Sequence, residues 1–492
     1  MSNNPAESKY GVSTHATFGR RKILVDYDYV DRSNILEVLE AAVEIHEKNR
    51  YEIQYLWDYY KGKQPVLDRT KEYREEVNWK VVENRAFEIV SFKDGYLMGE
   101  PIQYVSVGEI KDIEPLNTFN DWMRDCDKES VDQDIVNWMH VCGVGYRIVN
   151  SSKKVRRDKT EAPFYTYSLD PRDTFVVYSS SAFGEPAIMC VKYRKVNTPS
   201  VSPETFVFSC YTPERYFEIR GTLPLAEIVR DEFNALHDLP IIEYPLNKAR
   251  IGCFEMCTSI LDAINDVASN RVDAIAQFVD AIMLFHNVDV DDDVLAKVKE
   301  LGALAYYDRN ESMKGDIRYI TAELNQEQTQ TLVDHMYNTV LTICGMPNRN
   351  MNATSTSDTG SSVMLRNGWS DAEARAKSTE VLFRKSEKQF LRLALRIIGD
   401  VEPIDLKMAD IAIRFTRHNY ENIATKANVL STLIDKIPPA TAYVASGMFV
   451  DPQAEYEEYK RWKEEQKKEE EDDTEGSDKT GEITRVSSYL RG

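Results

Sequence analysis

Residues 254–285, FEMCTSILDAINDVASNRVDAIAQFVDAIMLF, have the pattern of one long amphipathic helix. Apolar residues recur in steps of three and four from Phe254 to Ile282, which is the repeat of one helix face. Polar and mostly acidic residues recur with the same spacing on another face, namely Asp262, Asp266, Ser269, Asp273, Gln277 and Asp280. At ~1.5 Å per residue the helix would be roughly 40 Å long. We therefore expect a rod that packs along one side and presents acid on the other.

Two more long helices are predicted further along the chain. Residues 325–344 have an apolar face and stop at Gly345 and Pro347, which are typical helix terminators. Residues 364–398 carry the apolar spine of a third helix. The intervening residues 348–363 read NRNMNATSTSDTGSSV, and a helix connection of this length is usually functional or disordered.

The first half of the chain is predicted to be α+β. Helical periodicity covers residues 34–60, a second helix is expected to end at Gly95, and a third spans about residues 116–141. From Gly145 onward, short β-branched and aromatic runs alternate with turn residues, which is the pattern of an antiparallel β region. The second half is predominantly helical, interrupted at residues 284–324 by a small helix and two strands, ALAYYD and DIRYITA.

Length, charge and cysteine usage limit the class of protein. A chain of 492 residues needs two or more compact regions, because single cores stop growing near ~250–300 residues. The net charge of −20 argues against a basic nucleic-acid-binding surface. No apolar run approaches the roughly 18–20 residues of a membrane span, and no signal peptide is recognisable. Seven cysteines without a CxxC pair indicate buried thiols, so we expect the chain to fold in a cytoplasm.

Catalytic and metal motifs are weak. HEKNR at 46–50 lacks the second histidine of a zinc-protease motif, and GKQ at 62–64 lacks the rest of a phosphate-binding loop. Four acidic residues have the spacing of calcium-loop ligands: Asp289, Asp291, Asp293 and Glu300. The position that needs glycine in such a loop is Val294, and acidic residues at a helix start explain the cluster as well. We expect no catalytic residue, no metal and no cofactor.

The order and spacing of several segments resemble a known family. These segments are YYKGKQPVL, NWKVVEN followed by GYLMGEPIQY, LPIIEYPLN, the long helix quoted above, and TSDTGSSVMLRN. Together they make the chain similar to the portal, or head-to-tail connector, proteins of long-tailed bacteriophages. The resemblance extends from about residue 34 to residue 458.

The resemblance implies an α+β portal fold divided into wing, stem, clip and crown. The implied regions are an N-terminal arm without stable order (1–32), the wing (33–253), a stem helix (254–283), the clip (284–324), a second stem helix (325–346), the tunnel loop (347–362), a long wing helix with a strand (363–418), the crown helices (419–470) and an acidic disordered tail (471–492).

Portal proteins form a ring, usually of twelve subunits, at one vertex of the capsid, and double-stranded DNA passes through the ring. The resemblance implies that terminase, through its large subunit, docks on this chain, and that a head-completion or adaptor protein docks there later. It also implies contacts with the major capsid and scaffold proteins and no contact with a membrane. The expected location is the portal vertex of the virion, after assembly in the host cytoplasm.

Carried over by position, the resemblance gives three sets of site residues. The tunnel-loop set is Asn348, Arg349, Asn350, Asn352, Thr354, Ser355, Thr356, Ser357, Asp358, Thr359, Gly360 and Ser361. The channel-lining stem set is Asp262, Asp266, Asp273, Gln277 and Asp280. The clip set, which would bind partners, is Asp291, Asp293, Tyr306, Tyr307, Arg309, Lys314 and Arg318.

The chemistry of these sets predicts weak contact with DNA. Every phosphate neutralised by Lys or Arg strengthens sequence-independent binding. The loop set contains one cation, Arg349, and the stem set is acidic. We therefore expect a channel that guides DNA without holding it.

Two other classes of protein remain open. A metal-dependent nucleic-acid enzyme could use the cluster at 289–293, although an enzyme needs convergent carboxylates and a base, and the sequence offers one local cluster. Another virion ring, such as an adaptor, would be expected to be much shorter and to lack the first half of this chain.

Overall fold

The computed structural model describes most of the chain. The described residues are 19–71, 77–107, 114–152, 158, 160–181, 184–196, 205–279, 282–286, 316–320, 326–348, 368–416, 423–449, 452 and 455–466. Their side chains are described except at 277–279, 282–286, 316–320, 326 and 423–425. The predicted acidic tail lies outside these residues.

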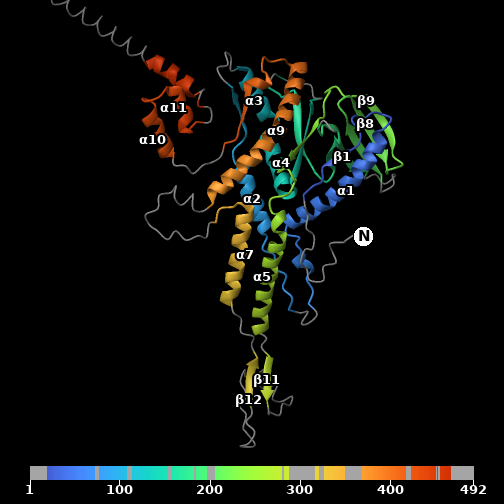
Figure 1. The fold of residues 1–492 in the computed structure, drawn as a ribbon, viewed down its shortest axis with the longest axis vertical. Coiled ribbons are helices and arrows are strands. Elements are labelled where there is room, and N and C mark those ends of the chain that lie inside the picture. The colour runs from blue at the N-terminus through green and yellow to red at the C-terminus, as the bar shows by residue number, and fades with distance from the viewer. Residues whose placement is uncertain are drawn as a thin grey trace, which may run out of the picture.

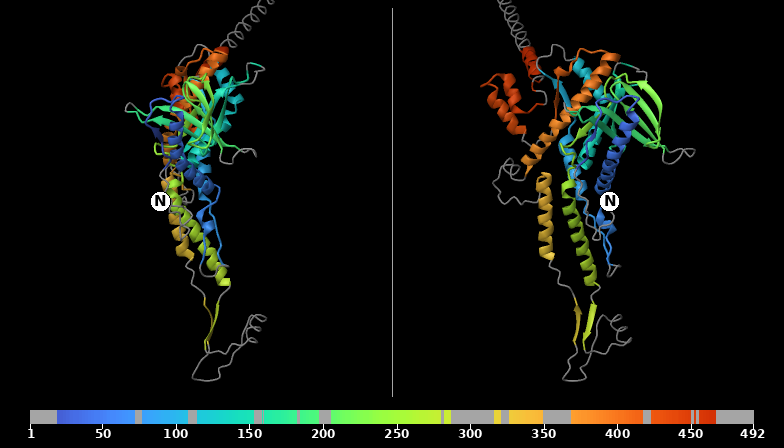
Figure 2. Two further views of the ribbon diagram at one scale, coloured as in Figure 1. Left: turned by 90° about the vertical axis from the view of Figure 1, so that its right-hand side faces the viewer. Right: turned by 45° about the vertical axis from the view of Figure 1, so that its right-hand side comes forward.

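The molecule is elongated, with an α/β body at one end and a pair of strands at the other (Figure 1). Two helices, α5 (Thr258–Val279) and α7 (Gln326–Cys344), run side by side from the body toward the strand pair. The strands β11 (Ile282–His286) and β12 (Asp316–Ile320) are antiparallel. Figure 2 shows the same rod-like extension from two further sides. The long helix was predicted slightly too long, because Ile282 is the first residue of β11.

The body contains two main sheets, with strand orders β1-β5-β6-β7-β8-β9 and β10-β3-β4. Their strands are β1 (Ile23–Val25), β3 (Val144–Ser151), β4 (Phe164–Leu169), β5 (Thr174–Ser179), β6 (Ala187–Lys195), β7 (Phe206–Tyr211), β8 (Arg215–Gly221), β9 (Glu227–Phe233) and β10 (Ile241–Pro245). The pairs from β3 to β10 are antiparallel, which confirms the predicted β region.

Strand β1 corrects one expectation. Residues 1–32 were predicted to form an arm without stable order, and this is wrong for residues 19–32. Ile23 and Val25 are buried, and β1 pairs in parallel with β5. Just before the strand, Arg20 is buried and its Nη2 atom lies 2.6 Å from Oε1 of the buried Glu255. The apolar alternation of this strand is only three residues long, so it is a weak signal in the sequence.

The helices of the first half lie where the sequence predicts them, but their boundaries differ and one predicted helix is two. Helix α1 (Ile35–Tyr60) matches its prediction. Helix α2 (Arg85–Met98) continues through Gly95, where it was expected to end. The single helix predicted at about 116–141 is wrong, because α3 (Glu114–Asp125) and α4 (Lys128–Cys142) are separate. They are divided at Asp127, whose φ of 52° is left-handed.

Helix α9 (Trp369–Val401) crosses the body from the upper end of α7 (Figure 1). Its predicted apolar spine is confirmed, since Phe383, Phe390 and Ala394 are buried. It starts after Gly368, which has a φ of 83° that glycine adopts without strain.

Helix α9 is anchored by a buried group of charges. Glu387 accepts a hydrogen bond of 2.9 Å from the hydroxyl of Tyr244 and lies 3.0 Å from the ammonium of Lys128. Burial alone would raise the pKa of Glu387, but the charges of Lys128 and Arg147 outweigh it and lower this pKa to about 2. Buried charges persist only when they are paired and hydrogen-bonded, so this group fixes how α9 sits on the body.

The remaining elements are small. They are η2 (Pro65–Asp68), β2 (Gln103–Ser106), η3 (Glu255–Cys257), η4 (Met408–Asp410), β13 (Ile411–Arg414), α10 (Ile423–Leu433) and α11 (Pro439–Ser446). Strands β2 and β13 pair with each other and bring the end of the α9 region back to the first half of the chain.

Candidate functional site

The predicted stem corresponds to the helix pair α5 and α7. The two helices are packed tightly only near the body, where Leu261 of α5 and Val340 and Leu341 of α7 belong to one buried apolar cluster. Farther from the body their apolar residues are uncovered. Ile275 is 48% exposed and Leu332 is 50% exposed. The rod therefore has apolar surface that the described part of the chain does not bury.

The polar face of α5 is covered by an extended segment of the same chain, residues 77–84, which we call the strap. Backbone N–H groups of the strap donate to α5 side chains one turn apart. Trp79 N donates to Asp273 (2.7 Å), Val81 N to Ser269 (3.0 Å) and Glu83 N to Asn265 (2.8 Å). Four helical residues rise about 6 Å and two extended residues about 6.6 Å, so alternate strap amides meet successive helix turns.

Charges and hydroxyls reinforce this cover. Asp273 lies 2.5 Å from the ammonium of Lys71 and 3.3 Å from the guanidinium of Arg69, just before the strap. Asp262 accepts a hydrogen bond of 2.9 Å from the hydroxyl of Tyr59. Burial and the charge of Asp262 raise the pKa of Tyr59, so this tyrosine stays a hydrogen-bond donor. Two acids of the α5 polar face, Asp262 and Asp273, thus have their partners inside one subunit.

The prediction that Asp262 and Asp273 line the channel is wrong. Asp262 is 3% exposed and Asp273 is 2% exposed, so neither can line an open channel. Asp266 is half-buried, and burial raises its pKa while the charge of Arg69 lowers it. Gln277 belongs to α5, where its backbone alone is described, and Asp280 lies outside the described residues.

Most exposed polar side chains of the rod lie on α7. Apart from the adjacent pair Asp334 and His335, those of one face lie three or four positions apart, and all are exposed: Glu327, Thr331, Asp334, His335, Asn338 and Thr342. We call this set the α7 polar face. The sequence did not single out this face, because the apolar repeat of the same helix is its stronger signal, although the polar repeat lies between those apolar residues.

The predicted tunnel loop begins beside the α7 polar face. Asn348 donates a hydrogen bond of 2.9 Å from its amide nitrogen to the side-chain oxygen of Asn338. The other predicted loop residues lie outside the described part of the chain: Arg349, Asn350, Asn352, Thr354, Ser355, Thr356, Ser357, Asp358, Thr359, Gly360 and Ser361. Asn348 is therefore the one residue of the tunnel-loop set that the structure describes.

The described part of the predicted clip belongs to the strand pair at the far end of the rod (Figure 1). Arg318 lies in β12, opposite Leu284 of β11. The other predicted clip residues lie outside the described part of the chain: Asp291, Asp293, Tyr306, Tyr307, Arg309 and Lys314. The acidic cluster from Asp289 to Glu300 lies outside it as well.

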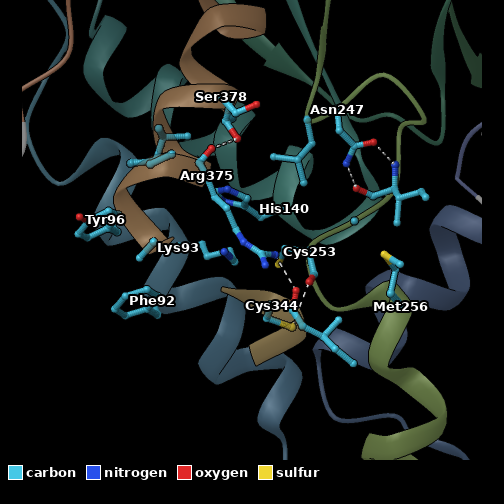
Figure 3. Close-up of a pocket in the computed structure, with 18 residues that line it drawn as sticks. Phe92, Lys93, Tyr96, His140, Asn247, Cys253, Met256, Cys344, Arg375 and Ser378 are labelled. Carbon is cyan, nitrogen blue, oxygen red and sulfur yellow. Dashed lines mark hydrogen bonds between the residues drawn. The ribbon is translucent and has the colours of Figure 1, made fainter. Parts of the chain in front are cut away.

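A cavity of about 340 Å³ lies where α7 meets the body. Figure 3 shows Arg375 reaching from α9 toward Cys344 at the end of α7. Arg375 donates a hydrogen bond of 2.6 Å to the carbonyl oxygen of Ile343, and a cation there complements the negative end of the helix dipole. Its side chain also lies beside Gly345, whose φ of 62° glycine adopts without strain.

Two ionisable side chains that line the cavity, Cys253 and His140, are held by their surroundings. Burial raises the pKa of the Cys253 thiol, which keeps it protonated. His140 pairs with Asp94 at 2.6 Å. Among the described residues no group of three or more His, Cys, Asp or Glu side chains is arranged to hold a metal ion.

Comparison with known proteins agrees with the architecture. The family model described as phage portal protein, SPP1 Gp6-like, matches residues 39–472. No curated protein matches the chain. Within the described ranges, no helix has both the length and the apolar character needed to cross a membrane. The family match spans most of the sequence and confirms the resemblance seen in its motifs, so the chain belongs to the phage portal protein family.

Proposed function

We propose that this virion protein forms a dodecameric ring at one capsid vertex and that double-stranded DNA passes through its bore. In this proposal DNA enters during packaging by terminase and leaves at ejection. The observation that carries the proposal is the rod of α5 and α7, which projects from the body with one polar helix face uncovered. Its role is structural and requires no catalytic residue.

The α7 polar face and the residues after Asn348 are the proposed channel surface. Cations would hold the duplex by neutralising phosphates. The α7 polar face instead offers hydroxyl, amide and carboxylate groups together with His335, and the loop from 348 to 361 offers one cation, Arg349. Carboxylates such as Asp334 repel phosphate, and hydroxyls and amides form only weak contacts. Such a surface lets DNA slide.

The proposed ring is closed by contacts between neighbouring rods. A ring requires a heterologous contact, in which one patch of a subunit meets a different patch of the next. Ile275 of α5 and Leu332 of α7 are about half exposed in the single subunit. Because half of each side chain is already buried, complete burial against the next subunit contributes about 1 kcal/mol each, roughly half the value of a fully exposed side chain.

The ends of the molecule are proposed to meet different partners. The strand pair β11–β12 at the tip, with Arg318, would be the clip that receives the terminase large subunit and later a head-completion or adaptor protein. The body would be the wing that contacts the major capsid and scaffold proteins. Helices α10 and α11 would be the crown, facing the capsid interior.

A deletion of residues 350–360 tests the channel. We expect rings of unchanged mass by native mass spectrometry and a loss of DNA packaging of at least tenfold, because the segment nearest to the DNA is gone. Replacing the same residues with a glycine-serine linker of equal length separates the chemistry of the loop from its length. Normal packaging by the deletion variant would contradict the channel role, and a protein that stays monomeric under packaging conditions would contradict the ring.

A further inference from the structure

Two buried thiols meet where the rod joins the body. Cys257 is the last residue of η3, directly before α5, and Cys344 is the last residue of α7. Their Sγ atoms lie 3.7 Å apart, and one S–H group hydrogen-bonds the other sulfur. The two residues are 87 positions apart in the sequence. Near 3.7 Å the sulfurs are in contact, and a disulfide needs them at about 2.05 Å.

The pair can be reached by a small reagent. Cys344 lines the cavity of about 340 Å³ shown in Figure 3, whereas Cys257 does not line it. Both belong to one buried apolar cluster. Hydrogen peroxide is little larger than water and fits such a cavity. Buried thiols elsewhere in the body, such as Cys190 and Cys210, do not line it.

The two sulfurs are placed unequally. Cys344 Sγ lies 3.7 Å from Cys257 Sγ and 3.4 Å from the carbonyl oxygen of Cys253. The thiolate is the form of cysteine that reacts with peroxide. Cys344 lines the cavity and is therefore the sulfur that peroxide meets first, and Cys257 is the thiol already in contact with it.

We propose that Cys257 and Cys344 form a latent disulfide, open during assembly and closed by a peroxide-class oxidant once the particle leaves the cell. The Cys344 thiolate attacks one oxygen of the peroxide, which gives a sulfenic acid and, with one proton, water. The Cys257 thiol then attacks the sulfenic sulfur, and a second water leaves as the S–S bond forms. In sum, two thiols and one hydrogen peroxide give one disulfide and two waters.

The change of redox environment between the cytosol and the released particle favours bond formation after assembly. Disulfides are rare in a reducing cytosol and persist outside cells and on virions. The timing rests on the proposed function, whereas the thiol chemistry depends only on the contact between the two residues. The bond would tie the body ends of α5 and α7 together, next to Gly345 and the start of the predicted loop. It would leave the strand pair at the far tip free.

Peptide mapping of the assembled, full-length protein tests the proposal. Reduced protein is treated with increasing hydrogen peroxide, alkylated, digested without reductant and examined by mass spectrometry. We expect a linked pair of peptides containing Cys257 and Cys344, lighter by two hydrogens, at peroxide concentrations that leave Cys190 and Cys210 as free thiols. The midpoint of thermal unfolding should rise by about 3 °C or more and return after dithiothreitol, because the bond closes a long loop.

Variants separate this disulfide from its alternatives. Cys253→Ser should still form the bond, whereas Cys344→Ser should abolish both the linked peptide and the rise in unfolding temperature. Two results overturn the proposal: Cys257 and Cys344 stay reduced when the other buried thiols oxidise, or Cys344 links to Cys253. Both can be read on the unaltered protein, so a variant that fails to fold does not block the test. Ring formation, measured on the same sample, is independent of either outcome.

Discussion

Helices α5 and α7 lie side by side and have similar amphipathic sequences, yet their polar faces have opposite environments. On α5, Asn265, Ser269 and Asp273 are buried and accept hydrogen bonds from the strap. On α7, the equivalent polar repeat, including Asp334 and Asn338, is exposed. A polar helix face is therefore exposed to solvent in one helix and forms a packing surface in its neighbour.

The difference arises from backbone chemistry. The strap forms neither a helix nor a strand among the described residues, so its N–H groups need acceptors outside regular secondary structure. The polar residues of α5 supply those acceptors at the right spacing. Residues that looked like a channel lining are thus part of the interior, and the candidate channel surface passes to α7.

The largest contrast is expected between Asp273→Ala and Asp334→Ala. The first change removes the carboxylate that pairs with Lys71 and Arg69 and that accepts the hydrogen bond of Trp79 N. It should therefore lower the free energy of unfolding by about 3–5 kcal/mol. The second removes an exposed carboxylate of the α7 polar face and should change it by less than about 0.5 kcal/mol. Urea unfolding at a matched oligomeric state measures both. Equal losses would show that the two helix faces do not differ.

A pH series extends the contrast to histidines. His46 is buried in α1, and burial lowers its pKa to about 4, against about 6.5 when unfolded. The unfolded chain therefore binds a proton that the folded chain does not, so stability falls as the pH drops from 6.5 to 4, by roughly 3 kcal/mol in all. We expect His46→Gln to reduce the slope of the free energy of unfolding against pH in this range by the amount that corresponds to about one bound proton.

The control for the pH series is His335→Gln, because His335 is exposed on the α7 polar face. This variant should keep the slope of the unaltered protein between pH 6.5 and 4. If His46→Gln keeps that slope as well, then burial of His46 does not govern the acid sensitivity.

The smallest effect on stability is expected from three added lysines on α7, Thr331→Lys, Asn338→Lys and Thr342→Lys. These positions are exposed, so each change should shift the free energy of unfolding by less than about 0.5 kcal/mol. If the α7 polar face meets DNA, the added cations should slow translocation and raise DNA retention several-fold at low salt. The gain should fall as salt rises.

A matched triple variant on the body controls for the added charge itself. Ala41→Lys, Ser130→Lys and Gln133→Lys add the same charge at exposed positions of α1 and α4. Retention should stay at the level of the unaltered protein. Equal retention by both triple variants across a salt series would remove α7 from the proposed channel.

Much of the fold could be predicted from local patterns. The repeat of apolar residues gave α1, α5, α7 and α9, and the short β-branched runs gave the antiparallel sheets. The order of motifs gave the family, which the match over residues 39–472 confirms. These signals are local, because periodicity and turn residues act over a few residues.

The parts that were wrong depend on contacts between distant residues. Asp273 and Trp79 are 194 positions apart, and no periodicity connects them. Arg20 pairs with Glu255 across a similar separation, which helps to order a segment expected to lack structure. The break at Asp127 places Lys128 beside Glu387 of α9, a partner that a local reading of the helix cannot supply.

A density map of the assembled protein would show which helix faces the proposed bore. We expect a ring with an axial hole, with Asn338 and Thr342 of α7 facing the hole and the strap of residues 77–84 behind α5. A particle without a hole would contradict this expectation, and so would a ring in which the strap faces the axis and the α7 polar face points outward.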